Sequence, residues 1–152
     1  MPTTIINFAY GSNMDPLQFE ERCPNSRYVC NAVLLNYEFV MTRRGYASVK
    51  RCQGSQVEGV LYELTKADEE NLAKNHEGVS FFYKRKYPQV QVGSKTVKAL
   101  LYIATNVTCD PIGKDEKPEY AAKIICGAKK YKLSMAYQDM LFGILGEYLD
   151  QT

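Results

Sequence analysis

The stretch Tyr10-Gly11-Ser12-Asn13 has the composition of a backbone cradle for a small ligand that carries a carboxylate or carbonyl group. It follows the apolar residues 4–9, which are typical of a strand, and precedes Asp15-Pro16, which is typical of a helix start. A chain that turns directly from a strand into a helix leaves several backbone N–H groups without partners. Because Gly11 has no Cβ, a ligand can approach the backbone closely there. The same residue types also form ordinary turns, so this stretch alone leaves both interpretations open.

A second candidate for chemistry is the carboxylate of Glu77. The segment Asn75-His76-Glu77-Gly78 is predicted to end a helix, and Gly78 is a typical residue at such an end. A carboxylate at this end meets the unfavourable pole of the helix dipole, so Glu77 breaks a local rule. The acidic residues 68–70, by contrast, fall near the start of the same helix. There we expect them at the surface, where negative charge stabilises the helix.

The aromatic residues after Glu77 indicate how its carboxylate would behave. Phe81, Phe82 and Tyr83 would remove water from it and raise its pKa toward neutrality. A general base works best when its pKa lies near the working pH, so Glu77 is our candidate general base. Most glutamates are only solvated, and that alternative stays open. We expect His76 to face the solvent at the helix end.

Length and composition limit the class of protein. The 152 residues are predicted to form one domain, residues 1–152, with a core of its own. A net charge of +2 does not favour nucleic acid or an anionic membrane as a partner, and no apolar segment approaches the ~18 residues of a membrane span. The five cysteines have no CxxC spacing and no signal peptide is visible, which predicts reduced thiols in a cytoplasmic protein. With His76 as the single histidine, we expect no metal site, and a histidine triad would have to use that residue.

Strand patterns dominate the first two thirds of the chain, and helix patterns dominate the end. The expected strands cover residues 4–9, 27–35, 37–42, 46–50, 57–64, 81–92 and 96–104. Helices are expected to begin at Asp15-Pro16, at Thr65, near residue 118 and after Ser134, and the last one has a buried stripe from Tyr137 to Tyr148. This segregation predicts an α+β fold with a mixed, mostly antiparallel, barrel-like sheet and flanking helices.

Several segments, in order along the chain, match one known family. They are Phe8-Ala9-Tyr10-Gly11-Ser12-Asn13, Gly59-Val60-Leu61-Tyr62, Glu77-Gly78-Val79, Tyr83-Lys84-Arg85 and the late segment from Pro118 to Gln138. Together they resemble the gamma-glutamylcyclotransferase-like superfamily, most closely its gamma-glutamylcyclotransferase branch. Each segment alone is weak evidence, whereas their common order over nearly the whole chain is specific.

The resemblance implies a barrel of about six strands with flanking helices, and often a homodimer. It implies that Tyr10, Gly11, Ser12 and Asn13 hold a γ-glutamyl group through backbone donors and that Glu77 is the general acid/base. It also implies that Tyr83, Tyr102 and Tyr120 wall the pocket. In this reaction the substrate's own α-amino group attacks the γ-carbonyl, which yields 5-oxoproline and releases an amine or amino acid. No cofactor and no metal are required.

Other functions remain open at this point. The same pocket could take γ-glutamylamines, an ε-linked γ-glutamyl lysine or a γ-glutamylated natural product, with loops 43–56 and 106–117 contributing to the choice. The sequence identifies neither the substrate nor whether glutathione is accepted. A non-catalytic module that binds γ-glutamyl compounds on the same fold is a second alternative, because fold does not imply function. A structural or interaction protein is a third.

Overall fold

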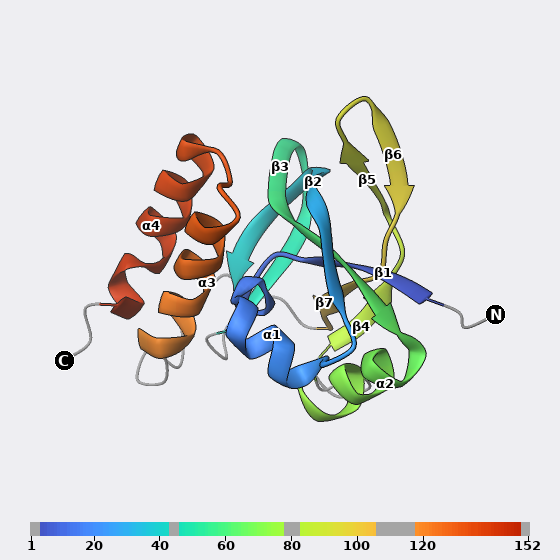
Figure 1. Ribbon diagram of the computed structural model, residues 1–152. Coiled ribbons are helices and arrows are strands. Elements are labelled where there is room, and N and C mark those ends of the chain that lie inside the picture. Colours follow the sequence, from blue (N-terminus) through green and yellow to red (C-terminus); the bar gives the residue numbers. More distant parts are fainter. Residues whose placement is uncertain (1–3, 43–45, 78–82, 106–117, 150–152) are drawn as a thin grey trace.

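A computed structural model describes residues 4–42, 46–77, 83–105 and 118–149 (Figure 1). The fold is α+β, with a curled antiparallel sheet that forms a half-barrel and is flanked by helices. The strands are β1 (Thr4–Ala9), β2 (Arg27–Met41), β3 (Ala47–Thr65), β4 (Tyr83–Lys86), β5 (Gln89–Val92), β6 (Lys95–Lys98) and β7 (Leu101–Ala104). The helices are the 3₁₀ turn η1 (Ser12–Met14), α1 (Pro16–Arg22), α2 (Lys66–Asn75), α3 (Pro118–Lys130) and α4 (Met135–Leu149). The predicted fold class is therefore confirmed.

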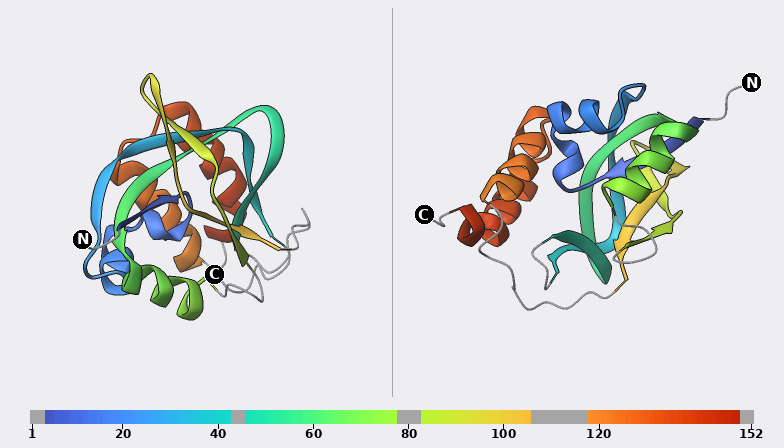
Figure 2. Two further views of the ribbon diagram at one scale, coloured as in Figure 1. Left: turned by 90° about the vertical axis from the view of Figure 1, so that its right-hand side faces the viewer. Right: turned by 90° about the horizontal axis from the view of Figure 1, so that it is seen from below.

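The strands form two sheets. Five strands pair in the order β1-β3-β2-β5-β6, and β4 pairs with β7. The ladders between these strands are antiparallel, and a single parallel bridge joins Asn7 to Leu100. In Figure 1 and Figure 2, α3 and α4 lie side by side at one end of the molecule, α2 lies at the far side, and α1 lies between them.

The long strands β2 and β3 differ from the prediction. We expected breaks at Asn36 and at residues 53–56, but each strand is continuous and the irregularity is a bulge. Asn36 has a left-handed φ of 65°, Gly54 a φ of 88°, and the β2–β3 register shifts at this point. The Gly54 N–H donates to Asn36 Oδ1 at 3.1 Å, so side-chain pairing replaces the missing ladder bond. The polar residues therefore bend a continuous strand, as bulges do.

The two later strands were also predicted wrongly, because each one divides between the two sheets. The segment predicted as 81–92 forms β4 in the small sheet and β5 in the large one, with Pro88 at the change. Proline has no N–H and cannot continue a ladder. The segment 96–104 divides in the same way into β6 and β7, and Leu100 at the change donates to the Ile6 carbonyl of β1 at 2.7 Å.

Helix starts follow the local signals. The side chains of Asp15, Thr65 and Ser134 accept from the backbone N–H three residues later, at 3.3, 3.1 and 3.2 Å. These caps confirm the predicted starts of α1, α2 and α4. The predicted cap Gly78 lies outside the described residues.

One cluster of buried residues contains side chains from β1 through to α4. In the predicted stripe of α4, Tyr137, Leu141 and Leu145 are buried, while the side chain of Tyr148 lies outside the described part. Gly127 of α3 lies directly on Met14 of η1, because a Cβ there would stand 2.5 Å from the Met14 backbone carbonyl. This close approach fixes the segment that connects β1 to α1.

Candidate active site

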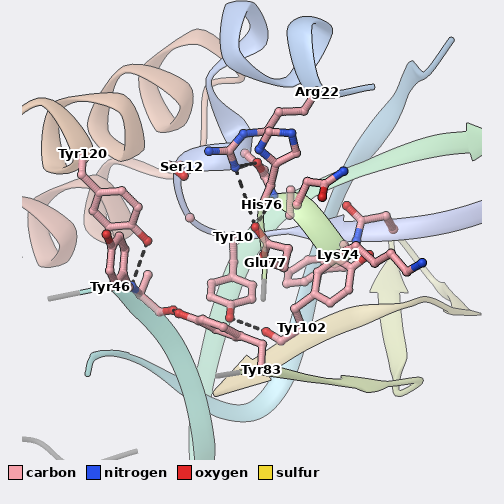
Figure 3. Close-up of a pocket in the computed structure, with 17 residues that line it drawn as sticks. Tyr10, Ser12, Arg22, Tyr46, Lys74, His76, Glu77, Tyr83, Tyr102 and Tyr120 are labelled. Carbon is pink, nitrogen blue, oxygen red and sulfur yellow. Dashed lines mark hydrogen bonds and ion pairs between the residues drawn. The ribbon is translucent and has the colours of Figure 1, made fainter. Parts of the chain in front are cut away.

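A pocket of about 380 Å³ opens beside η1, and its size suits a small molecule (Figure 3). It is lined by all eight residues that the sequence singled out, namely Tyr10, Gly11, Ser12, Asn13, Glu77, Tyr83, Tyr102 and Tyr120. They come from the end of β1, η1, the segment after α2, the β4–β7 pair and the start of α3. Positions that are 110 residues apart in the sequence therefore meet at one cavity.

The loop after β1 lines this pocket and contains backbone donors that are not used within the described residues. The carbonyl oxygens of Gly11 and Ser12 accept from the N–H groups of Met14 and Asp15 at 3.0 and 2.9 Å. Within the described residues, the N–H groups of Gly11, Ser12 and Asn13 have no acceptor. A Cβ on Gly11 would lie 3.8 Å from the Tyr120 hydroxyl, so glycine keeps the space in front of the loop open.

Glu77 lies against this loop. Its Oε2 accepts from Asn13 Nδ2 at 3.5 Å and lies 3.7 Å from Arg22 Nη1, and its side chain is 18% exposed. Burial raises the pKa of the Glu77 carboxyl above its usual range, while Arg22 and Asn13 act in the opposite direction. For Oε1 no partner is recorded among the described residues. Phe81 and Phe82, which we expected to remove water from this carboxylate, lie outside the described part.

Three tyrosines form walls with hydroxyl groups that already have protein partners. Tyr10 donates to the Tyr102 carbonyl at 2.5 Å, and Tyr83 donates to the Ala47 carbonyl at 2.6 Å. Tyr102 donates to Glu69 Oε2 at 2.6 Å. Burial raises the pKa of Tyr10 and Tyr102, which keeps both hydroxyls protonated at neutral pH. These side chains shape the pocket mainly through their rings.

Tyr120 differs because its hydroxyl accepts a hydrogen bond from the protein. The Ala47 N–H donates to Tyr120 Oη at 2.9 Å, and the ring packs edge-on against Tyr46 with centroids 5.1 Å apart. Burial raises the pKa of Tyr120, so its own proton stays on the oxygen. No acceptor for that proton is recorded among the described residues, and Tyr120 can therefore donate to a ligand.

Two of the three acidic residues near the start of α2 are buried, which corrects the expectation that they lie at the surface. Glu69 is 5% and Asp68 7% exposed. Glu69 accepts from Arg85 at 3.0 and 3.3 Å and from Tyr102, and Asp68 Oδ2 accepts from the Asn25 N–H at 2.8 Å. Each buried carboxylate thus has partners that compensate its loss of water. Only Glu70 is exposed, as expected.

Basic residues at the pocket were missed by the sequence analysis. Arg22, Lys74 and His76 line it, and Figure 3 places Arg22 and His76 next to Glu77. The side chain of His76 is exposed, as predicted. Partial loss of water around the ring, together with the charge of Arg22, lowers its pKa. Arg22 donates to Asn13 Oδ1 at 2.9 Å. The position of His76 directly before Glu77 was a usable signal, whereas nothing in the spacing connects Arg22 to residue 77.

Asn7 was missed as well. Its Nδ2 donates to the Leu100 carbonyl at 3.2 Å, and its buried Oδ1 has no partner within the described residues. Asn7 belongs to the pocket wall. Buried polar atoms are normally paired, so this oxygen is an exception within the pocket wall.

The described residues contain neither a cluster of metal ligands nor a membrane-spanning helix. No three His, Cys, Asp or Glu side chains among them lie close enough together to hold a metal ion. No helix within the described ranges has the length and apolar character needed to cross a membrane.

Comparisons with known proteins agree with the geometry. A family model, "Gamma-glutamyl cyclotransferase, AIG2-like", matches residues 7–122. Gamma-glutamylcyclotransferases of Mus musculus and Homo sapiens are each 27% identical to the chain, over 93% of it and 79% of their own length. A solved structure of gamma-glutamyl cyclotransferase superposes with a TM-score of 0.84 at 25% identity, covering 93% of this chain and 88% of the other. YkqA from Bacillus subtilis gives 0.78 at 25% identity, over 95% of this chain and 55% of its own. The chain therefore belongs to the AIG2-like gamma-glutamyl cyclotransferase family.

Proposed function

We propose that this chain is a gamma-glutamylcyclotransferase that converts a γ-glutamyl amide into 5-oxoproline and a free amine or amino acid. The observation that carries the proposal is the position of Glu77, whose partly buried carboxylate lies 3.5 Å from Asn13, in a loop whose backbone donors have no acceptor among the described residues. Both line one pocket. A base beside a row of amide donors is the arrangement that this cyclisation needs.

The reaction needs no nucleophile from the protein. The substrate's α-amino nitrogen attacks its own γ-carbonyl carbon, a new C–N bond closes the five-membered ring, and the old amide C–N bond breaks. Glu77 accepts one proton from the α-ammonium group before the attack and delivers it to the leaving nitrogen. The second proton, which the attacking nitrogen loses once the ring has closed, follows the same route, so the amine leaves as an ammonium group. The raised pKa of Glu77 suits both steps, because the carboxyl group must take up and release a proton near neutral pH. Its Oε1, which has no partner among the described residues, is the atom that we assign to this transfer.

The loop would hold the substrate in the ring-closing conformation. The N–H groups of Gly11, Ser12 and Asn13 suit a carboxylate or the oxygen of the γ-carbonyl, on which negative charge develops during attack. Correct orientation of two groups in one molecule can contribute roughly 7–11 kcal/mol toward the barrier. We therefore assign to the loop, together with the aromatic walls, the larger part of catalysis.

The charges at the pocket narrow the substrate class. Arg22 and Lys74 contribute positive charges, whereas His76, with its lowered pKa, is mostly neutral at pH 7. Glu77 is the single acidic residue among the described residues that line the pocket. A γ-glutamyl amino acid carries a second carboxylate on its leaving group, which such a rim attracts. A γ-glutamylamine lacks this carboxylate. We therefore favour γ-glutamyl amino acids or peptides as substrates.

The decisive experiment is an assay of 5-oxoproline release from a panel of γ-glutamyl compounds. The panel contains γ-glutamyl-L-alanine, γ-glutamyl-L-glutamate, glutathione, an ε-linked γ-glutamyl lysine and a γ-glutamylamine. Release from at least one member supports the proposal. Binding of panel members without any product would favour the non-catalytic module instead. The homodimer and the cytoplasmic location stay predictions, which size determination in solution and cell fractionation test separately.

A further inference from the structure

Behind the loop, two residues that do not line the pocket connect to it through hydrogen bonds. Lys123 of α3 extends its Nζ to Gln18 Oε1 at 2.8 Å. Gln18 of α1 is 8% exposed, and its Nε2 lies 3.0 Å from Ser12 Oγ and 3.4 Å from Asn13 Oδ1. The line of contacts thus runs from α3 through α1 to two residues of the candidate cradle.

Lys123 determines which atoms donate and which accept in this series of hydrogen bonds. An ammonium group has only donors, so the atom of Gln18 that faces Lys123 must be the acceptor Oε1. The amide NH₂ group of Gln18 must then face the loop, where it donates to both Ser12 and Asn13. As long as Lys123 is charged, Oε1 and Nε2 of Gln18 cannot exchange places without losing these hydrogen bonds.

The direction determines what Ser12 offers to a ligand. Its Oγ accepts from Gln18, so the hydroxyl proton must point elsewhere, and no acceptor for it is recorded among the described residues. Ser12 lines the pocket and is 8% exposed. Its hydroxyl therefore acts as a donor toward an oxygen of the bound molecule.

The same direction determines the orientation of Asn13. Its Oδ1 accepts from Gln18 and, at 2.9 Å, from Arg22 Nη1. The NH₂ group of Asn13 is thereby turned toward Glu77 Oε2 at 3.5 Å, where it stabilises the ionised carboxylate. A reversed Asn13 would present its oxygen to Glu77 and would disfavour that ionised form.

We propose that Gln18 and Lys123 are positioning residues, which orient the Ser12 hydroxyl and the Asn13 amide as donors into the pocket. This inference rests on the proposed function, because it assumes that the bound molecule presents a carboxylate or carbonyl oxygen to the loop. It assigns a role to two residues, in separate helices, that do not line the pocket.

The test reverses the direction while keeping the shape. In Gln18→Glu the carboxylate still accepts from Lys123, now as a charge-assisted pair, but it cannot donate to Ser12. Ser12 must then give its proton to residue 18. We expect an unchanged or higher Tm, a KM for γ-glutamyl-L-alanine at least tenfold higher, and an acid limb of the kcat/KM profile at higher pH. Leu17→Glu is the matched control, because Leu17 is 73% exposed on the same helix and the added charge should leave KM unchanged.

A double-mutant cycle separates lost donation from a general disturbance. Ser12→Ala removes that donor itself, so Gln18→Glu should raise KM less in this background than in the wild type, and the part that remains is its effect through Asn13. Lys123→Met, which frees the Gln18 amide to turn, should raise KM severalfold, and Lys123→Arg should restore it. A wild-type KM in Gln18→Glu, or losses from Ser12→Ala and Gln18→Glu that multiply fully, would overturn the inference.

A readout without turnover distinguishes this inference from the proposed function. If the wild type releases no 5-oxoproline from any panel member, the proposed function fails, and the orientation is then judged by NMR alone. The side-chain amide protons of Gln18 should exchange slowly with water in the wild type and in Lys123→Arg, and fast in Lys123→Met. Equal exchange in all three proteins would contradict the positioning role.

Discussion

Glu77 is a partly buried carboxylate whose surroundings act on its pKa in opposite directions. Burial raises its pKa, while Arg22 at 3.7 Å and Asn13 at 3.5 Å favour the ionised form. Burial makes a carboxylate a stronger base, whereas a cation and a hydrogen-bond donor favour its ionised form. Both influences suit the role of general base that we propose for Glu77.

Glu77→Gln is expected to fold and to lose turnover by ~10²–10⁴-fold, because the amide cannot accept the proton of the substrate. The same change should raise the Tm at pH 7. The folded protein raises the pKa of Glu77 above its unfolded value of ~4.3, so ionisation of this group costs stability that glutamine avoids. The stability gain should disappear below about pH 4, where the carboxyl is protonated in both states. The exposed Glu70→Gln is the control, and wild-type turnover in Glu77→Gln would contradict the assigned role.

Arg22→Met is expected to move the acid limb of the kcat/KM profile to higher pH. The guanidinium lowers the pKa of Glu77, so its removal lets burial raise that pKa further. Because the base must be ionised to work, activity should then rise only at higher pH. The control is Arg27→Met, which removes the exposed ion pair with Glu63 and should leave the profile in place. An unshifted limb in Arg22→Met would show that Arg22 does not tune Glu77.

At the scale of elements, local sequence signals predicted the helix starts correctly. They failed for strands whose ends depend on pairing with strands distant in the sequence. Asp15, Thr65 and Ser134 bond to N–H groups three residues away, so their sequence neighbours contain the whole signal. The segments 81–92 and 96–104 each divide because their two halves pair in different sheets. The sequence within each segment does not indicate which sheet a half will join. The bulge between Asn36 and Gly54 is likewise a contact between strands.

The same distinction applies to the site. The Tyr10–Asn13 loop and Glu77 stand out locally, one by its composition and the other by its place at a helix end. Arg22 and Lys74 reach the pocket because of how α1 and α2 lie relative to each other, which the spacing of residues within each helix does not determine. The burial of Glu69 was missed for the same reason, since its partners Arg85 and Tyr102 come from β4 and β7 of the small sheet.

The contact of α3 with η1 predicts opposite results for two glycine substitutions. Gly127→Ala places a Cβ against the Met14 backbone and should destabilise the fold by about 1–3 kcal/mol, with loss of activity as the loop shifts. Gly143→Ala in α4 meets open space and should be neutral or stabilising by up to ~1 kcal/mol, because alanine favours helix. Urea unfolding of both variants provides the comparison. Equal effects of the two changes would refute the close contact.

At the scale of the whole molecule, the net charge is small, but the charges are unevenly distributed around the pocket. The chain has 19 Lys and Arg residues and 17 acidic residues, yet the pocket is lined by Arg22 and Lys74, and Glu77 is the single carboxylate that the described residues contribute to it. Such a local field acts on a charged ligand near the opening even when the net charge is small. Selection among leaving groups is therefore an expected property of the pocket, and Lys74, the exposed member of the set on α2, is the residue with which to test it.

Lys74→Glu is expected to change substrate preference without abolishing activity. The kcat/KM for γ-glutamyl-L-glutamate, whose leaving group is an anion, should fall several-fold, while that for a γ-glutamylamine should stay within twofold. Added salt should reduce the difference, because screening weakens exposed charges. Lys66→Glu is the matched control, since Lys66 is exposed at the other end of α2 and does not line the pocket. If both substrates lose activity equally in Lys74→Glu, the leaving group is not recognised by the charge of this rim, and the choice of γ-glutamyl amino acids over γ-glutamylamines fails with it.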